Sequence, residues 1–205
     1  MAVMSEGRML GKNGQEGPLS LRLMEKRETS LPGVCLIAPK IFRDERGFFL
    51  ETFRAEAFAA LGIPGPFIQD NLAGSHRGVL RGLHYQVRNP QGKLVQVVRG
   101  EIFDVAVDMR RSSPYFGRWF GARLDSETRT AIWVPPGFAH GYYVLSEWAE
   151  VGYKVTDRYT PDAERTLLWN DPAVGVDWPI GPGETPVLSA KDADGKLLRD
   201  ADTYE

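Results

Sequence analysis

The sequence is short of the residues that build disulfides, metal sites and membrane spans. Cys35 is the single cysteine among 205 residues, so the chain can form neither an internal disulfide nor a multi-cysteine zinc site. No apolar run approaches the roughly 18 residues of a membrane span, and the polar N-terminus lacks the apolar segment of a secretory signal. We therefore expect a cytoplasmic protein with no membrane partner.

Net charge is also low. The chain carries 25 Lys and Arg against 27 Asp and Glu, which leaves a formal charge of -2. Proteins that hold nucleic acid need an excess of positive charge to neutralise phosphates. We therefore expect no nucleic-acid partner, although a local basic pocket remains compatible with this balance.

Histidine is scarce as well, with only His76, His84 and His140. Metal sites in small β-barrels use several His and carboxylate ligands, commonly two His at alternate positions of one strand. The residue two beyond His84 is Gln86, so the sequence predicts no metal, and catalysis should rest on organic acid–base groups. A plain structural role, as a hydrogen-bonded core or turn histidine, stays open for each.

Glycine and proline, by contrast, are abundant. The 22 Gly and 14 Pro make up about 18% of the chain, where roughly 12% is usual. In residues 102–109, apolar and other side chains alternate between the two faces of a strand. If residues 81–86 also form a strand, the His84 side chain points to one face and those of Leu83 and Tyr85 point to the other. The one clear helix candidate is 55–61. Further strand candidates are 34–37, 48–53, 94–98, 118–124, 131–134, 141–145, 150–155 and 167–169.

Many short strands joined by turns predict an all-β barrel or sandwich with a few short helices. Residues 1–30 are polar and mixed in charge, and we expect them to form a poorly ordered N-terminal extension. No repeat or interior linker divides the rest, so residues 31–205 are predicted to form a single domain.

Three basic residues, Arg46, Arg81 and Lys93, stand in or beside strand-like segments. One interpretation is ion pairing with nearby carboxylates such as Asp104 or Asp108. The other is an anion clamp, in which arginine binds phosphate through two hydrogen bonds and lysine acts as a point charge. Spacing alone does not decide between them.

Nine segments, in order along the chain, carry a family resemblance: 42–49 with Glu51, 69–71, 78–86, 91–95, 104–108, 133–141, 153–154, 169–172 and 188–192. In these segments the chain resembles the dTDP-4-dehydrorhamnose 3,5-epimerases, sugar-nucleotide epimerases with a cupin-like jelly-roll fold. The match runs from about residue 32 to residue 193. The departures are the N-terminal extension and the run Leu72–Gly74.

The resemblance implies a substrate and a reaction. The substrate is dTDP-4-dehydro-6-deoxy-D-glucose, a dTDP-linked 4-keto-6-deoxyhexose whose C4 ketone acidifies the hydrogens on C3 and C5. Deprotonation to an enolate and reprotonation on the opposite face invert both centres and give dTDP-4-dehydro-L-rhamnose without a cofactor. The resemblance also implies a homodimer.

The resemblance further implies catalytic roles. His84 matches the base, Asp192 the carboxylate that orients it, Tyr153 the acid on the other face of the sugar, and Lys93 the group that stabilises the enolate oxygen. His140 contacts the sugar or shapes the pocket. The other positions that match substrate-binding residues are Arg46, Glu51, Gln69, Asn71, Arg81, Glu164 and Lys191.

Several alternatives remain open. Tyr159 competes with Tyr153 as the acid, and Asp171 competes with Asp192, although the Asp-Pro that follows Trp-Asn is typical of a turn. At the level of function, the alternatives are an epimerase that inverts a single centre, a non-catalytic sugar-nucleotide-binding cupin, and a metal-dependent cupin.

Overall fold

Two antiparallel sheets form the body of the protein in the computed structural model, which describes residues 23–63 and 65–205. The larger sheet has the strand order β1 (Met24–Glu28), β2 (Cys35–Pro39), β10 (Ala131–Val134), β7 (Lys93–Arg99), β12 (Trp148–Val155) and β5 (Gln69–His76). The smaller sheet has the order β13 (Glu164–Thr166), β6 (Leu80–Gln86), β11 (Phe138–Val144), β8 (Glu101–Asp108) and β9 (Trp119–Asp125). This confirms the all-β jelly-roll expectation.

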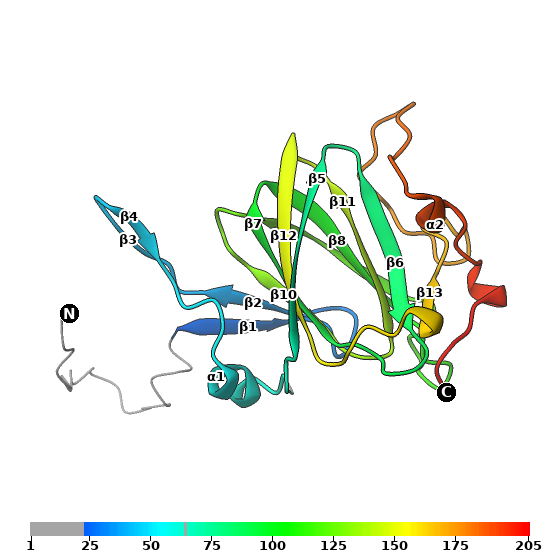
Figure 1. Cartoon of the computed structure of the whole chain (residues 1–205), viewed down its shortest axis with the longest axis horizontal. Helices are drawn as coiled ribbons and strands as arrows, with labels where there is room; N and C mark the ends of the chain where they lie inside the picture. The colour runs from blue at the N-terminus through cyan, green and yellow to red at the C-terminus, as the bar shows by residue number, and fades with distance from the viewer. Residues whose placement is uncertain (1–22, 64) are drawn as a thin grey trace.

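The remaining elements are short. They are the hairpin β3 (Phe42–Asp44) with β4 (Gly47–Phe49), the helices α1 (Ala55–Ala60) and α2 (Ala190–Ala193), and the 3₁₀ turns Pro161–Ala163 and Leu198–Asp200. The hairpin projects away from the two sheets (Figure 1). Its aromatic side chains are exposed, Phe49 to 70%.

The main core lies between the two sheets. In β8, Ile102 and Ala106 are fully buried in this core, whereas Val105 and Val107 point to the other face, as the sequence alternation predicts. A fully buried isoleucine or valine side chain of this kind stabilises the fold by about 1.5–3 kcal/mol. The inner faces of the two sheets therefore pack together through apolar residues.

The outer face of the smaller sheet is covered by the C-terminal segment. Leu83 and Tyr85 of β6 pack there with Trp178. Two hydrogen bonds fix the chain end: Tyr85 donates its hydroxyl to the carbonyl of Asp202 at 2.6 Å, and Tyr204 donates to the carbonyl of Gln86 at 2.5 Å. This wrapping brings α2 against β6 (Figure 1).

The predicted element bounds need three corrections. Residues 24–28, assigned to the extension, form strand β1, which pairs with β2 through backbone hydrogen bonds and buries only Met24, so its polar composition gave no signal. The strand expected at 167–169 lies instead at Glu164–Thr166, and that expected at 48–53 is β4, Gly47–Phe49. Residues 1–22 of the predicted extension lie outside the described residues.

Candidate active site

The pairing of β6 with β11 decides which polar side chains enter the space between the sheets. His84 lies opposite His140, and Arg81 lies opposite Tyr142, so three residue steps along β6 match two along β11. Gly82 makes this possible with a φ of +127° and a close approach to Gly141, whose Cα would lie 2.6 Å from an added Cβ. As a result, His84 and Arg81 share the inner face although they are an odd number of residues apart.

His84 forms a hydrogen-bonded pair with Asp192. Its Nε2 lies 2.5 Å from Oδ1 of Asp192, and the two side chains are 28% and 5% exposed. The carboxylate also accepts from the backbone N–H of Gly82 at 3.2 Å and from the Ser189 hydroxyl at 2.6 Å. Ser189 is in turn the N-cap of α2 and accepts from the backbone N–H of Asp192. The carboxylate is thus held in place by donors from two elements.

These contacts determine the charge of the pair. Burial opposes ionisation of Asp192, but its hydrogen bonds from His84 and Ser189 outweigh that effect and lower its pKa to about 2. Burial lowers the pKa of His84, and the positive charges of Lys93 and Lys191 lower it further. The hydrogen bond with Asp192 raises this pKa but does not cancel the lowering. At neutral pH the carboxylate is therefore ionised and the imidazole neutral. Nε2–H donates to Asp192, which leaves Nδ1 as the free base.

Lys93 provides an ammonium beside this pair. Its Nζ donates to the backbone carbonyl of His84 at 3.1 Å. Burial lowers the pKa of Lys93 to about 8, although the carboxylates of Glu164 and Asp104 pull it upward. The group is mostly charged at neutral pH and is suited to stabilise an oxyanion.

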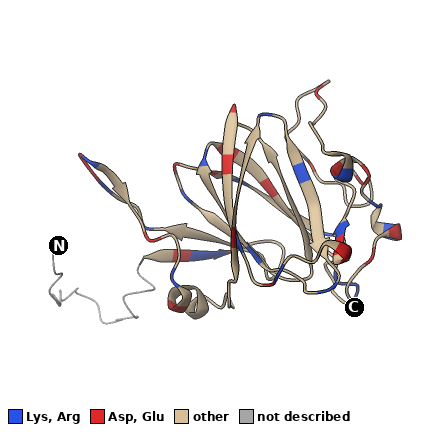
Figure 2. Ribbon diagram, in the orientation of Figure 1, with Lys and Arg blue, Asp and Glu red and all other residues tan. Residues whose placement is uncertain are grey.

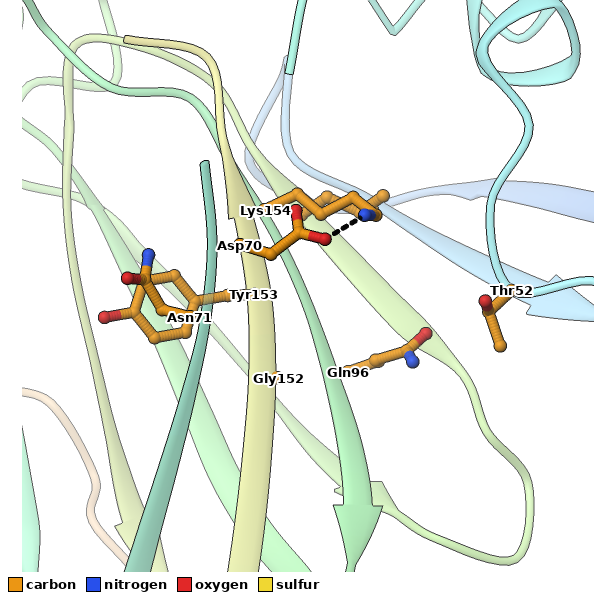
Figure 3. Close-up of a pocket in the computed structure, with 8 residues that line it drawn as sticks. Thr52, Asp70, Asn71, Gln96, Gly152, Tyr153 and Lys154 are labelled. Atoms are coloured by element: carbon orange, nitrogen blue, oxygen red, sulfur yellow. Dashed lines mark hydrogen bonds and ion pairs between the residues drawn. The ribbon is translucent and has the colours of Figure 1, made fainter. Parts of the chain in front are cut away.

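Tyr153 reaches the same space from the opposite sheet, where it packs against the inter-sheet core. A pocket of about 230 Å³ beside β12 is lined by residues that include Gln96, Lys154, Asn71 and Tyr153. In Figure 3 the side chains of Tyr153 and Asn71 lie on the opposite side of the β12 ribbon from those of Gln96 and Thr52. Burial raises the pKa of Tyr153, while the Arg81 charge lowers it. The phenol is therefore protonated at neutral pH and can act as a proton donor.

Glu164 and Lys191 lie beside the imidazole as an ion pair. Tyr159 donates its hydroxyl to Glu164 at 2.7 Å. Burial works against ionisation of Glu164, yet the hydrogen bonds from Lys191 and Tyr159 outweigh it and lower the pKa of this carboxyl. Tyr159 is thus engaged at the exposed rim, whereas Tyr153 faces the interior.

His140 belongs to a second buried pair. Its Nε2 lies 2.9 and 3.0 Å from the two carboxylate oxygens of Asp104, which is fully buried on β8. Asp104 was expected to support a neighbouring cation, and the structure places a histidine on it instead. The competing aspartate, Asp171, accepts from the backbone N–H of Ala173 and Leu198 and so occupies a turn, as its Asp-Pro sequence predicts.

The structure brings most of the predicted site residues together. His84, Lys93, Arg81, His140, Tyr153, Glu164, Lys191 and Asp192 surround the inter-sheet space or its rim. Gln69 and Asn71 lie on β5, where Asn71 is paired with Tyr153 in the ladder, and they hydrogen-bond each other at 2.8 Å. This clustering joins residues that the sequence separates widely.

Arg46 and Glu51 lie elsewhere. Arg46 sits at the turn of the projecting hairpin β3–β4 and pairs with Asp44, while Glu51 pairs with Arg54 at the start of α1. In Figure 1 this hairpin and the β6–α2 region are at opposite ends of the molecule. Within one chain these two residues are therefore not part of the His84 site.

Sequence reasoning missed the supporting roles of Ser189 and Ser75 and gave Asp104 a different partner. Ser189 aligns the Asp192 carboxylate, and the spacing Ser-x-x-Asp is a helix-capping pattern that could have shown it. Ser75 accepts a hydrogen bond from Arg81 Nε at 2.9 Å, and Asp104 pairs with His140. Both contacts depend on the register of neighbouring strands. Sequence spacing carries no information on such contacts.

Charges of both signs are interspersed over the strands and loops (Figure 2). Within residues 23–63 and 65–205, no helix is long and apolar enough to cross a bilayer. In the same part of the chain, no three His, Cys, Asp or Glu side chains group closely enough to hold a metal ion.

A jelly-roll barrel whose interior holds a neutral imidazole on a carboxylate, a phenol and an ammonium has the groups of an acid–base enzyme. A sequence model described as dTDP-4-dehydrorhamnose 3,5-epimerase matches residues 28–200. The chain therefore belongs to the dTDP-4-dehydrorhamnose 3,5-epimerase family, a family of isomerases, and the resemblance inferred from the sequence is confirmed.

Individual relatives agree with this assignment. A dTDP-4-dehydrorhamnose 3,5-epimerase of Pseudomonas aeruginosa is 52% identical over 182 residues, covering 88% of this chain and 99% of the relative. The crystal structure of an epimerase from Legionella pneumophila in complex with dTDP-4-keto-L-rhamnose has a TM-score of 0.85 and 50% identity, and covers 87% of this chain and 95% of that one. A 3'-monoepimerase from Streptomyces bikiniensis in complex with dTDP-quinovose is 37% identical, with a TM-score of 0.77 and coverages of 83% and 86%.

Proposed function

We propose that the protein converts dTDP-4-dehydro-6-deoxy-D-glucose into dTDP-4-dehydro-L-rhamnose by epimerisation at C3 and C5. The observation that carries this proposal is the hydrogen bond of 2.5 Å between His84 and Asp192, which leaves a neutral imidazole with a free Nδ1 between the two sheets. A hydrogen next to a ketone is acidic enough for such a base, because the enolate places the charge on oxygen.

Each half-reaction uses groups from facing sheets. His84 removes the proton from the carbon beside the ketone, and the electron pair of the broken C–H bond moves into the enolate, with negative charge on O4. The Lys93 ammonium stabilises that oxygen. Tyr153 then gives its proton to the same carbon from the opposite face, so the centre is inverted and a phenolate remains. No group other than acid, base and ammonium enters this scheme, and we propose that no cofactor or metal takes part.

Recognition of the nucleotide part rests on charged and polar groups around this centre. Arg81 shares β6 with His84, and we propose that it bridges the diphosphate and the sugar. We assign the remaining substrate contacts to Gln69, Asn71, His140, Glu164 and Lys191. We also propose that the enzyme acts in the cytoplasm.

A homodimer accounts for the position of Arg46 and Glu51. Both match substrate-binding positions in the sequence, yet the hairpin that carries Arg46 and precedes Glu51 lies at the opposite end of the molecule from β6 and α2. The hairpin β3–β4 exposes three phenylalanines, Phe42, Phe48 and Phe49, which is unfavourable for a free surface. We propose that the hairpin of one copy reaches the His84 site of the other and supplies Arg46 there.

Isotope exchange tests the reaction. The purified protein is incubated with the 4-keto sugar nucleotide in deuterated water, and the product is examined by NMR. We expect deuterium at both C3 and C5, and loss of most turnover in His84→Ala and Tyr153→Phe. Label at one carbon only would assign a single-centre reaction, and label at C3 alone would match the reaction named for the Streptomyces bikiniensis relative. Binding of dTDP without exchange would make the protein a binding module.

Mixing two inactive variants tests the dimer. A His84→Ala chain retains the hairpin, and an Arg46→Ala chain retains the base. If the hairpin acts on the other copy, the mixed dimer has one complete site, and random exchange of subunits restores about a quarter of wild-type activity. If Arg46 acts within its own chain, every site lacks one group, and the mixture stays inactive.

A further inference from the structure

The hydroxyl of Tyr142 is buried and has no hydrogen-bond partner among residues 23–63 and 65–205. The residue is only 5% exposed, and its ring packs in the core between the two sheets. Buried hydroxyl groups are nearly always hydrogen-bonded, because an unpaired one costs about 1–3 kcal/mol of desolvation. A phenylalanine would fill the same space without that cost, so the hydroxyl requires an explanation.

The neighbours of Tyr142 belong to the proposed active site. On the ladder it lies opposite Arg81 of β6 and Asp104 of β8. Arg81 donates its Nε–H to the Ser75 hydroxyl at 2.9 Å, and Ser75 is itself buried. Because Ser75 accepts this bond, its own proton is free to be donated, and the Tyr142 oxygen is an available acceptor beside it.

The electrostatic environment places Tyr142 near the proposed acid as well. Burial is the main cause that raises the pKa of the Tyr142 phenol, while the Arg81 charge and the Ser75 hydroxyl lower it and the Tyr153 phenol raises it. Tyr142 and Tyr153 both pack against the inter-sheet core, one from each sheet. Arg81, Ser75 and Tyr153 thus all act on the acidity of a hydroxyl that has no hydrogen-bond partner among the described residues.

We propose that Tyr142 is a positioning residue for Tyr153, and that its hydroxyl ends a chain of donors that begins at Arg81 and passes through Ser75. This inference rests on the proposed function, in which Tyr153 protonates the enolate carbon. In that step the O–H bond of Tyr153 breaks, a C–H bond forms, and the electron pair remains on the Tyr153 oxygen. Tyr142 donates a hydrogen bond to this phenolate and keeps its own proton.

The proposed acid needs such a donor. Burial and the Glu164 charge both make Tyr153 a weaker acid, and Arg81 is the cation that offsets them. Arg81 is at the same time committed to Ser75 and to the carbonyl of Gly74. A hydrogen bond from Tyr142 that strengthens when the phenolate forms would favour the transition state over the ground state.

The test compares two tyrosines on one strand. Tyr142→Phe removes the hydroxyl and keeps the ring. Tyr143→Phe makes the same change on the other face of β11, where Tyr143 packs with the apolar residues that cover the outer face of the smaller sheet. We expect Tyr142→Phe to lower kcat roughly tenfold with KM within about twofold, since a hydrogen bond made only in the transition state acts on kcat alone. Tyr143→Phe should keep the wild-type kcat. An unchanged kcat in Tyr142→Phe would overturn the inference.

A double substitution shows whether Tyr142 acts through Tyr153. In a Tyr153→Phe background there is no phenolate to stabilise, so adding Tyr142→Phe should leave the residual deuterium exchange at C3 and C5 unchanged. A further tenfold loss there would assign Tyr142 a structural role and refute the inference. Exchange by the wild-type protein at both carbons confirms the proposed function separately, whatever the Tyr142 variants do.

Discussion

Replacing Asp192 with asparagine isolates the charge behind the proposed base. Oδ1 of Asp192 accepts from His84 at 2.5 Å and from Gly82 N at 3.2 Å, and Oδ2 accepts from Ser189 at 2.6 Å. An asparagine can keep its carbonyl oxygen toward His84 and donate its amide to the Ser189 oxygen. The shape of the pair and the tautomer of His84 are then retained, and mainly the negative charge is lost.

That charge stabilises the imidazolium formed when His84 takes a proton. A hydrogen bond to a charged group contributes about 1.5–3 kcal/mol, which corresponds to a loss of about 10- to 150-fold in kcat. The same hydrogen bond raises the pKa of His84 against the effect of burial. Asp192→Asn should therefore lower the maximal rate and move the acid limb of the pH–rate profile to lower pH.

The assay is kcat by NMR of the product, measured from acidic to neutral pH. Asp171→Asn is the matched control, because Asp171 and Asp192 are, as whole residues, both 3% exposed, and Asp171 accepts from the backbone N–H groups of Ala173 and Leu198. The control should lower the Tm and keep the acid limb. A kcat within threefold of wild type in Asp192→Asn, or an acid limb displaced to higher pH, would refute the reasoning.

Three further outcomes are expected. Because the pKa of Lys93 is about 8, kcat should fall as pH rises through that value. Lys93→Met should remove this alkaline limb of the pH–rate profile and lower kcat about 10²- to 10³-fold, and an unchanged kcat in this variant contradicts the oxyanion role. The pKa of Asp192 falls from 3.8 to about 2 on folding, which stabilises the fold by about 2 kcal/mol above pH 3.8. This stabilisation is lost as pH falls through 2, and urea unfolding of the wild type and of Asp192→Asn at a series of pH values measures the loss. Gly82→Ala should cost several kcal/mol more than Gly47→Ala, since both glycines have a φ of +127° but only Gly82 meets neighbouring backbone; equal Tm losses would contradict this.

How far the sequence predicts the fold depends on whether a segment carries an apolar pattern. The apolar run 131–134 is buried at all four positions and forms β10 with the predicted bounds. Strand β1 has the sequence MEKRE and is held by its ladder with β2, so no local signal exists. Edge strands of this kind are stabilised by backbone pairing and stay polar against aggregation.

For the site, the resemblance located the pair of His84 and Asp192, which the structure joins, but strand alternation misplaces Arg81. Counting from His84, alternation puts Arg81 on the other face, and only the backbone of Gly82 returns it to the inner face. Arg46 matched a substrate-binding position, yet the structure has it in a hairpin that projects away from the two sheets. The local sequence of the hairpin does not predict in which direction it projects. Tertiary register and assembly therefore account for what sequence reasoning could not reach.

The two members of the His84–Asp192 pair are 108 positions apart, and the carboxylate arrives on a helix near the end of the chain. During synthesis on the ribosome, every barrel strand emerges before that helix does. A nascent chain can thus close its barrel while the imidazole still rotates freely. We therefore expect turnover to be gained last in folding, so that refolding followed by activity reports the docking of the C-terminal segment, whereas refolding followed by tryptophan fluorescence also reports earlier collapse.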